Sequence, residues 1–307
     1  MDKNICAPNK YDNKNNTCFS LEQLLEMAKA YNRYITKIKL SPEEKQYIKV
    51  DTIKIKEDKQ YLLKELLKKF DKICKGNEFC LSKQEFMNEV VKEMREEIDQ
   101  HTFRPSGPPN PTEWISTIDI NNILIQYEQV YSDFKFLGAV PLNCDELQFC
   151  SLYKLDFGKY DKMGVTRFGI IFNYDKFGQA GSHWVTAVAN TETGEIYFCD
   201  SMGKKPFGNI VKFIEQFRKY YENETGEKII YKYNTKKYQT DSSECGIYSI
   251  NFIIRLLSGE SYEDIIDDSL DFQGINSCRS VYFRNKPSKF KPHPKCDPDT
   301  DSANKKI

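Results

Sequence analysis

The chain has 307 residues, 39% of them hydrophobic and 29% charged, as in a globular protein with one large or two modest domains. Its 45 basic and 45 acidic side chains balance, so net charge does not indicate a nucleic acid partner. The opening residues lack the apolar core of a signal peptide, and no stretch approaches the roughly 18 apolar residues of a membrane span. We therefore expect an intracellular monomer that is not secreted and contacts no membrane.

Residues 1–104 are predicted to form a helical region. A capping box, Ser20-Leu-Glu-Gln23, opens one helix, and Ser41-Pro42-Glu43-Glu44 repeats the signature with proline at the first helical position. Apolar residues recur at helical spacing over 61–70, and Ser82-Lys-Gln-Glu85 starts another helix. The faces between these helices are charged, so we expect a scaffold or a substrate-docking module here rather than a catalytic one.

A proline-rich segment, 105–112, separates this region from the expected catalytic domain, 113–286. Four prolines and a glycine in eight residues sustain neither a helix nor a central strand. Short β-branched or apolar runs then predict strands at 168–172, 184–188, 195–200 and 228–233, and longer ones predict helices at 210–221 and 245–257. This mixture predicts an α+β fold. The proline- and charge-rich residues 287–307 predict a flexible tail.

Ten cysteines are spread through the chain without a C-x-x-C pair. Since no secretion signal precedes them, reduced thiols in a cytosolic setting are favoured over a disulfide framework. Cys74 and Cys80, like Cys144 and Cys150, are separated by five residues, which is wider than the usual zinc-ligand pair. We interpret them as ordinary buried thiols and expect no metal and no cofactor.

Cys245 stands where a strongly apolar run begins, in QTDSSECGIYSINFIIRLLSG. A helix that is apolar nearly all round is a buried central helix. Ser242 or Ser243 can cap it, which places Cys245 in the first turn, where the helix dipole and unpaired N–H groups stabilise a thiolate. The alternative is a structural role, because free cysteine is among the most buried residue types.

A thiolate nucleophile needs an imidazole and a carboxylate that orients it. Of the three histidines, His101 lies beside the linker and His293 lies in the expected tail, whereas His183 opens a predicted strand. Asp200 closes the next strand. In an antiparallel pair the start of one strand lies beside the end of the other, so the hairpin itself should bring His183 and Asp200 together.

Gln239 precedes Cys245 by six positions. Acyl transfer generates an oxyanion, and hydrogen-bond donors aimed at that oxygen usually stabilise it most. The side-chain amide of Gln239 can donate alongside the backbone N–H of Cys245. Taken alone, Gln239 would be interpreted as an ordinary loop residue.

The order and spacing of four motifs resemble those of the SUMO-protease and adenovirus-protease superfamily: His183-Trp184, Asp200-Ser201, Gln239 and Glu244-Cys245-Gly246. The resemblance covers about residues 110 to 260. It implies a papain-like α+β fold, with a central helix packed on a mixed sheet, and a cysteine endopeptidase or deconjugase. It also implies roles: His183 as general base, Asp200 as its orienting partner, Cys245 as nucleophile and Gln239 as oxyanion donor.

The two tryptophans extend the resemblance to substrate binding. In the SUMO proteases one tryptophan follows the histidine, another opens a W-[LI]-x-[DN] motif, and the pair flanks a Gly-Gly stretch of substrate. Here Trp184 follows His183 and Trp114 opens WISTIDINNIL. The resemblance therefore implies cleavage after small residues, glycine above all. One departure is Thr117, which replaces the acid that helps engage the ubiquitin-like partner; the first acid is Asp119.

The segment WISTIDINNIL, the preceding helical region and the Lys-, Asn- and Ile-rich composition look similar to the polyprotein-processing proteases of large DNA viruses of mimivirus type. This implies an enzyme that cleaves viral structural precursor proteins during virion maturation, in the virion or the host cytoplasm. The alternatives are a deconjugating isopeptidase for SUMO or another ubiquitin-like protein, an acetyltransferase like the related bacterial effectors, and a binding module without catalysis. The effector family usually has a glutamate in the triad and a basic inositol-phosphate site, and the sequence shows no clear basic cluster for one.

Overall fold

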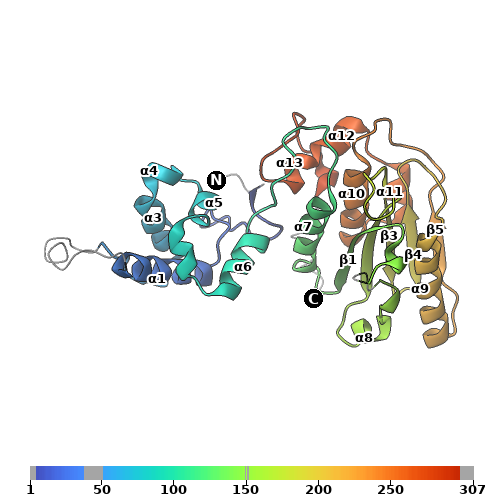
Figure 1. Ribbon diagram of the computed structural model, residues 1–307, viewed down its shortest axis with the longest axis horizontal. Coiled ribbons are helices and arrows are strands. Elements are labelled where there is room, and N and C mark those ends of the chain that lie inside the picture. Colours follow the sequence, from blue (N-terminus) through green and yellow to red (C-terminus); the bar gives the residue numbers. More distant parts are fainter. Residues whose placement is uncertain (1–4, 38–50, 149, 151, 298–307) are drawn as a thin grey trace. The chain divides into compact units, whose positions relative to one another are not determined.

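The chain divides into two units, residues 1–104 and 105–307, each with its own apolar core (Figure 1). We call them the helical unit and the α/β unit. The computed structural model describes residues 5–37, 51–148, 150 and 152–297. The division falls at the start of the proline-rich segment.

The helical unit is built from short helices: α1 (Leu21–Lys37), α3 (Lys59–Lys69), α4 (Asp71–Cys74), α5 (Glu78–Leu81), the 3-10 helix η2 (Glu85–Glu89) and α6 (Lys92–His101). The predicted capping box at the start of α1 is confirmed. The Gln23 N–H donates to Ser20 Oγ at 3.1 Å, and the Ser20 N–H donates to Gln23 Oε1 at 3.0 Å. The helix expected from Ser41 lies outside the described residues.

The single helix expected from Ser82 is wrong. Ser82 instead ends α5, and extended backbone at Val90 and Val91 separates η2 from α6. Two adjacent β-branched residues lower the helix propensity here slightly. Val90 is also 4% exposed, so packing into the core of the helical unit reinforces the break.

The α/β unit contains a mixed five-stranded sheet in the order β1-β2-β3-β4-β5. Its strands are β1 (Phe134–Pro141), β2 (Arg167–Asn173), β3 (Trp184–Asn190), β4 (Glu195–Cys199) and β5 (Ile230–Tyr233). β3 is antiparallel to both of its neighbours, and the two outer pairs are parallel. The four predicted strands are confirmed. β1 was not predicted, and its pairing with β2 shifts register between Phe136 and Ala139, around Gly138, which has φ +103°.

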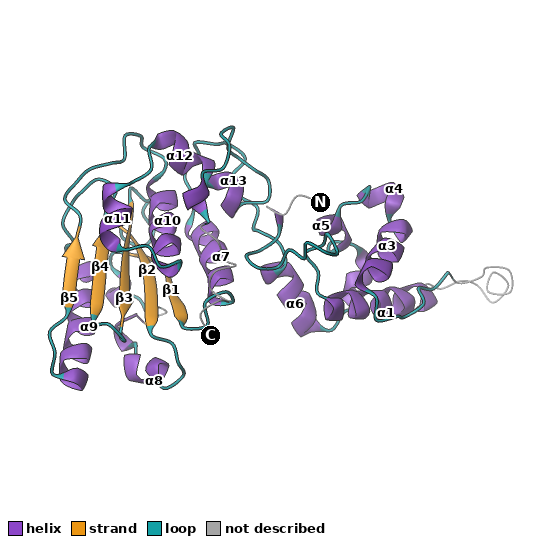
Figure 2. Cartoon of the chain, turned by 180° about the vertical axis from the view of Figure 1, so that it is seen from behind, coloured by secondary structure: helices purple, strands orange, loops and turns teal. Residues whose placement is uncertain are grey.

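Helices cover both faces of this sheet (Figure 2). One face carries α7 (Thr117–Glu128), α10 (Cys245–Leu257), α11 (Tyr262–Asp267), α12 (Phe272–Ser277) and α13 (Arg279–Tyr282). The other carries α8 (Phe157–Asp161) and α9 (Asn209–Thr225), with the 3-10 helices η3 (Cys144–Glu146) and η4 (Leu152–Lys154). Twelve of the thirteen residues of α10 are buried, as its all-round apolar pattern predicts. The expected α+β class, a central helix packed on a mixed sheet, is confirmed.

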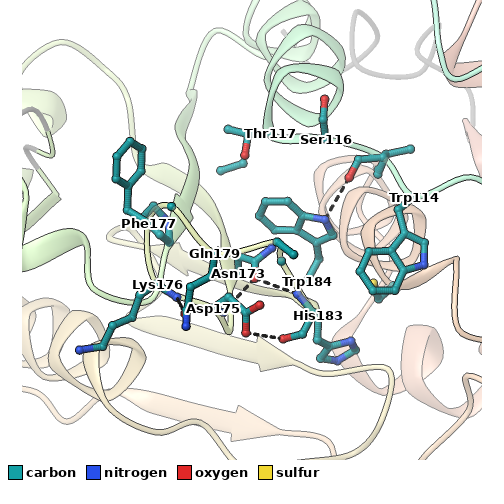
Figure 3. Close-up of a pocket in the computed structure, with 18 residues that line it drawn as sticks. Trp114, Ser116, Thr117, Asn173, Asp175, Lys176, Phe177, Gln179, His183 and Trp184 are labelled. Carbon is teal, nitrogen blue, oxygen red and sulfur yellow. Dashed lines mark hydrogen bonds between the residues drawn. The ribbon is translucent and has the colours of Figure 1, made fainter.

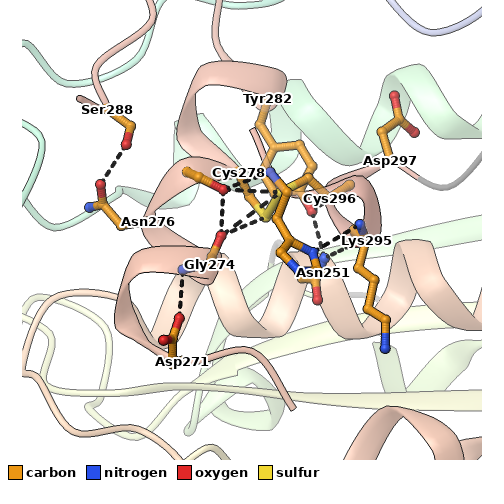
Figure 4. The surroundings of a disulfide bond; sticks show 12 residues. Asn251, Asp271, Gly274, Asn276, Cys278, Tyr282, Ser288, Lys295, Cys296 and Asp297 are labelled. Atoms are coloured by element: carbon orange, nitrogen blue, oxygen red, sulfur yellow. Dashed lines mark hydrogen bonds between the residues drawn. A yellow bond between two sulfur atoms is a disulfide. The ribbon is translucent and has the colours of Figure 1, made fainter. Parts of the chain in front are cut away.

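The C-terminal segment differs from the flexible tail expected from residue 287. As far as Asp297 it packs on the α/β unit and includes the 3-10 helix η5 (Pro294–Cys296). Asn251 of α10 donates to the Lys295 carbonyl at 2.8 Å, and the Tyr282 hydroxyl donates to the Cys296 carbonyl at 2.8 Å (Figure 4). Composition missed this because buried hydrogen bonds and a disulfide, rather than apolar side chains, fix the segment.

The expectation of reduced thiols is also wrong. Four disulfides join Cys6–Cys18, Cys74–Cys80, Cys144–Cys150 and Cys278–Cys296. The Cα atoms of each pair lie 5.0 to 5.6 Å apart, the separation that a disulfide requires. Cys199 and Cys245 are free, and both are buried.

None of the described helices is both long and apolar enough to cross a bilayer. Within the same residues, no three His, Cys, Asp or Glu side chains are grouped so that they could hold a metal ion.

Replacing Cys278 and Cys296 by serine should lower the free energy of unfolding of the α/β unit by about 3 kcal/mol, because the disulfide closes a loop across a sequence separation of 18. Urea unfolding followed by tryptophan fluorescence measures this, since both tryptophans belong to the α/β unit. Cys199→Ala, which removes a free buried thiol, is the control and should cost less. Equal losses in the two variants would contradict a structural role for the disulfide.

Candidate active site

The β3–β4 hairpin brings His183 and Asp200 together. His183 directly precedes β3, Asp200 directly follows β4, and the antiparallel register pairs Thr186 with Cys199. His183 Nε2 lies 2.6 Å from Asp200 Oδ1. The geometry expected from the two strands is therefore present in the structure.

Asp200 is fully buried, and its carboxylate is surrounded by donors. The Met202 N–H donates to Oδ1, and the Tyr174 hydroxyl donates to Oδ2, each at 2.7 Å. Burial raises the pKa of Asp200, but the hydrogen bond and charge of His183, together with these two donors, outweigh burial and lower it. Asp200 is thus held as an anion facing the imidazole.

Cys245 is the first residue of α10, and it lines the same pocket as His183, close enough to influence the pKa of the imidazole. With Nε2 on Asp200, the ring nitrogen left for the sulfur is Nδ1. Burial lowers the pKa of His183, but its interactions with Asp200 and Cys245 raise it to about 9. The imidazole is therefore a cation at neutral pH.

The start of α10 is capped differently from the expectation. Neither Ser242 nor Ser243 caps the helix, and Glu244 occupies the N-cap position without a side-chain cap. Asp241 Oδ1 instead accepts the N–H groups of Ser243 at 2.7 Å and Glu244 at 2.9 Å. The carboxylate of Asp241 thus holds the turn that leads into Cys245.

Gln239 is buried and fixed at both ends of its side chain. Its Oε1 accepts from the Ser201 hydroxyl at 2.5 Å, and its Nε2 donates to the Asp241 carbonyl at 2.8 Å. Gln239 does not line the pocket that contains Cys245. The structure therefore places it beside the turn that precedes Cys245, with one amide hydrogen already engaged.

A pocket of about 520 Å³ opens over Cys245 and His183. Trp114 and Trp184 both line it, from the segment before α7 and from the start of β3, and the loop 175–182 lines another side (Figure 3). Trp184 is 8% exposed, and its Nε1 donates to the Ile115 carbonyl at 3.1 Å. Trp114 is 48% exposed, so its indole remains accessible to a ligand.

Gly246 allows Ile115 to approach α10 closely. A Cβ atom on Gly246 would lie 2.5 Å from Ile115 Cγ1 and 3.2 Å from Trp184 Cδ1. Any side chain here would push the segment that carries Trp114 away from Cys245. The glycine after the cysteine is thus explained by close packing.

Sequence reasoning missed Tyr174 and the pocket loop 175–182. Register explains Tyr174: Asn173, the last residue of β2, pairs with Trp184, so Tyr174 lies beside His183, and the centres of the two rings are 5.2 Å apart. A tyrosine at the end of a strand next to the histidine strand was the available signal. His101 and His293, which had been set aside, are not among the residues that line the pocket.

Comparison with known proteins identifies the family of the chain. Residues 170–286 match the Ulp1 protease family, C-terminal catalytic domain. The chain is 53% identical over 296 residues to "Putative thiol protease R355" of Acanthamoeba polyphaga mimivirus, an alignment that covers 96% of this chain and 98% of that protein. It is 22% identical over 204 residues to a cysteine protease of African swine fever virus, covering 59% of this chain and 72% of the relative.

The fold is also found in a solved structure. A crystal structure of the African swine fever virus protease matches with a TM-score of 0.58 and 18% sequence identity, covering 72% of this chain and 90% of that one. This likeness concerns the fold, whereas the mimivirus relative establishes the family. The chain belongs to the Ulp1 protease family and is a cysteine-type peptidase.

Proposed function

We propose that this peptidase is an endopeptidase in which Cys245 is the nucleophile, His183 the general base and Asp200 the residue that orients His183. The observation that carries the proposal is the 2.6 Å contact between Asp200 and His183, together with the shared pocket that His183 lines with Cys245 at the start of α10. Cys245 is also the one free thiol among the described residues that line the pocket. Acyl transfer by a thiol requires a nucleophile, a base beside it and a group that orients the base.

The reaction follows from this geometry. In the proposed reaction His183 already carries the proton of Cys245, and the Cys245 thiolate attacks the scissile carbonyl to form a tetrahedral oxyanion. The backbone N–H of Cys245 lies in the first turn of α10, where it has no partner within the helix and can donate to that oxyanion. The second amide hydrogen of Gln239 is the other proposed donor. His183 then protonates the leaving amine, and water hydrolyses the thioester.

The proposed substrate is a Gly-Gly site. Trp114 and Trp184 are two flat indoles beside the nucleophile, and residues without side chains fit most easily between such walls. Trp184 is held by its bond to Ile115, which is part of the segment that carries Trp114. The two walls are thereby linked to one another.

We propose viral structural precursor proteins as the substrates, cleaved during virion maturation. Two observations support this: the named relatives are viral proteases, and a chain with four disulfides suits a virion better than a reducing cytoplasm. Residues 113–286 would form the catalytic domain, and residues 1–104 a scaffold or docking module.

A second candidate is a deconjugating isopeptidase, because one relative from African swine fever virus is named a "SUMO-1 cysteine protease". Thr117 stands where the deconjugases have an acid, and the nearby Asp119 is engaged within its own helix. Its Oδ2 accepts from the Ser116 N–H and hydroxyl, each at 2.7 Å. This capping box leaves Asp119 less available to a partner protein, which favours the endopeptidase.

Cys245→Ala should abolish cleavage of Gly-Gly-x peptides while the protein stays folded, because the variant lacks the nucleophile. The matched control is Cys199→Ala, since Cys199 is the other free thiol and contacts the Tyr238 hydroxyl instead of the pocket. It should cleave at the parent rate. Mass spectrometry of peptide products and circular dichroism of each variant supply the two readouts.

The same proteins are then incubated with a ubiquitin-like protein that ends in a Gly-Gly electrophile. Peptide cleavage without labelling of Cys245 by this probe supports the endopeptidase, and rapid labelling supports the isopeptidase. Peptide cleavage by Cys245→Ala would disprove the assignment of the nucleophile.

The pKa of about 9 at His183 predicts the alkaline limit of activity. The leaving amine needs the imidazolium proton, so kcat/KM should fall as pH rises through about 9. Asp200→Asn removes the anion that raises this pKa, so the alkaline limit should move to lower pH. The rate at the optimum should also drop by up to about 10⁴-fold.

The free energy of unfolding should also fall at alkaline pH. A raised histidine pKa stabilises the folded protein fully below its ordinary value of 6.5, and this contribution fades as pH rises through about 9. Thermal unfolding of the parent and of Asp200→Asn from about pH 6 to about pH 10 measures the difference. If kcat/KM fell at the same alkaline pH in the parent and in Asp200→Asn, Asp200 would not set the pKa of His183.

A further inference from the structure

Glu244, the residue before Cys245, forms a fully buried ion pair with Arg279 of α13. Arg279 Nε donates to both carboxylate oxygens, at 3.2 and 3.0 Å, and both side chains are 0% exposed. The pair spans 35 residues of sequence. Buried charges of this kind are costly to desolvate and are retained only where the geometry satisfies them.

Further hydrogen bonds extend this pair to two other segments. Asn276 of α12 donates to Glu244 Oε1 at 2.9 Å and to the Pro111 carbonyl at 2.6 Å. Arg279 Nη2 donates to the Glu113 carbonyl at 2.7 Å. We call Glu244, Asn276 and Arg279 the buried network; it ties the start of α10 to helices α12 and α13 and to the residues just before Trp114.

We propose that the buried network fixes the separation between the Cys245 thiol and the Trp114 indole, so that Glu244, Asn276 and Arg279 are positioning residues for the peptidase reaction. This inference rests on the proposed function, in which Cys245 attacks a substrate that passes Trp114. Glu244 is bonded covalently to Cys245, and Glu113 to Trp114. One guanidinium therefore holds the neighbours of both groups.

Close packing couples the segment 113–115 to the start of α10, so a displacement of one displaces the other. Ile115 rests directly on Gly246, where no Cβ would fit. The Ile115 carbonyl also accepts the Trp184 indole N–H at 3.1 Å. The segment 113–115 is thus held by Arg279 at one end and by α10 and Trp184 at the other.

Loss of the Glu244 charge should disturb this arrangement. Among the described residues, Glu244 is the acid paired with Arg279, and Arg279 Nη1 has no hydrogen-bond partner there. A neutral side chain at 244 leaves a buried cation uncompensated, so the helix start or α13 must move. A displacement of about 1 Å at a reacting group costs about 100-fold in rate.

The chain offers a matched control at the opposite end of the same helix. Arg255 of α10 is also buried, and its Nη2 lies 2.6 Å from Glu260 Oε2. Glu260→Gln therefore removes the acid from an ion pair of similar chemistry, far along α10 from Cys245. It should lower stability without changing the site.

The first experiment compares Glu244→Gln with Glu260→Gln in the full-length protein. We measure kcat and KM on a Gly-Gly-x peptide, the rate of Cys245 alkylation by iodoacetamide, and the unfolding midpoint in urea. Glu244→Gln should lose about 100-fold in kcat/KM and alkylate more slowly, whereas Glu260→Gln should keep both rates. Equal stability losses with parent kcat and alkylation in both variants would overturn the proposal.

Arg279→Lys provides a second test, which decides the matter if Glu244→Gln does not fold. A lysine keeps the charge beside Glu244 but loses the Nη2 bond to the Glu113 carbonyl. The alkylation rate of Cys245 should stay close to that of the parent, while KM should rise several-fold. Acrylamide quenching of tryptophan fluorescence should increase, because the segment that carries Trp114 would be held less tightly. Trp114 is the more exposed of the two tryptophans and so reports this change. Unchanged KM and quenching would contradict the link to Trp114.

Failure of the proposed function would look different. If the parent protein cleaves no Gly-Gly-x peptide and its Cys245 resists iodoacetamide near neutral pH, the nucleophile itself is misassigned, and the positioning role falls with it. If the parent cleaves and alkylates normally, the comparison of Glu244→Gln with Glu260→Gln tests the buried network alone.

Discussion

The hydrogen bond between His183 and Asp200 exists because β3 and β4 are antiparallel neighbours in a sheet covered on both faces. The antiparallel hairpin sets the two side chains at one end of these strands, where Asp200 is fully buried and His183 lines the pocket. Burial alone would favour the neutral form of both groups, and the interaction between them is the largest effect that keeps each one charged. The position of Cys245 depends on the same sheet, since α10 packs on β3 and starts beside His183. The site is thus a consequence of strand order and of one buried helix.

The cost of burying charge is met locally around α10. Asp200 is satisfied by His183, Tyr174 and a backbone N–H, and Glu244 by Arg279 and Asn276. Neutral groups would fill these positions at lower cost in desolvation. Ionic groups with fixed partners, however, allow few arrangements of the segments that carry them. In a site where about 1 Å of displacement matters, that restriction is useful for catalysis.

What could be predicted from the sequence was local. The α10 helix has an apolar pattern all round, and the hairpin follows from two strands joined by a short turn, so the sequence places Cys245 at a helix start and His183 beside Asp200. The motif order of the resembling family is what joined Cys245 to the other two. Tyr174, one strand away, required the β2–β3 register. The Glu244–Arg279 pair joins positions 35 residues apart, and no pattern near either residue announces it. The disulfides were missed for another reason: sequence spacing shows that two cysteines can meet, but oxidation depends on the environment.

The C-terminal helices and the segment after them therefore support the start of α10, where Cys245 lies. The disulfide Cys278–Cys296 joins the residue before Arg279 to the segment that Asn251 and Tyr282 hold against α10 (Figure 4). The backbone of Arg279 is in this way fixed by the disulfide of the preceding residue, and its side chain is fixed by Glu244. A polar, proline-rich sequence here suggested mobility because it lacks apolar residues. Its order comes from a covalent bond and from backbone carbonyls that accept buried donors, neither of which composition records.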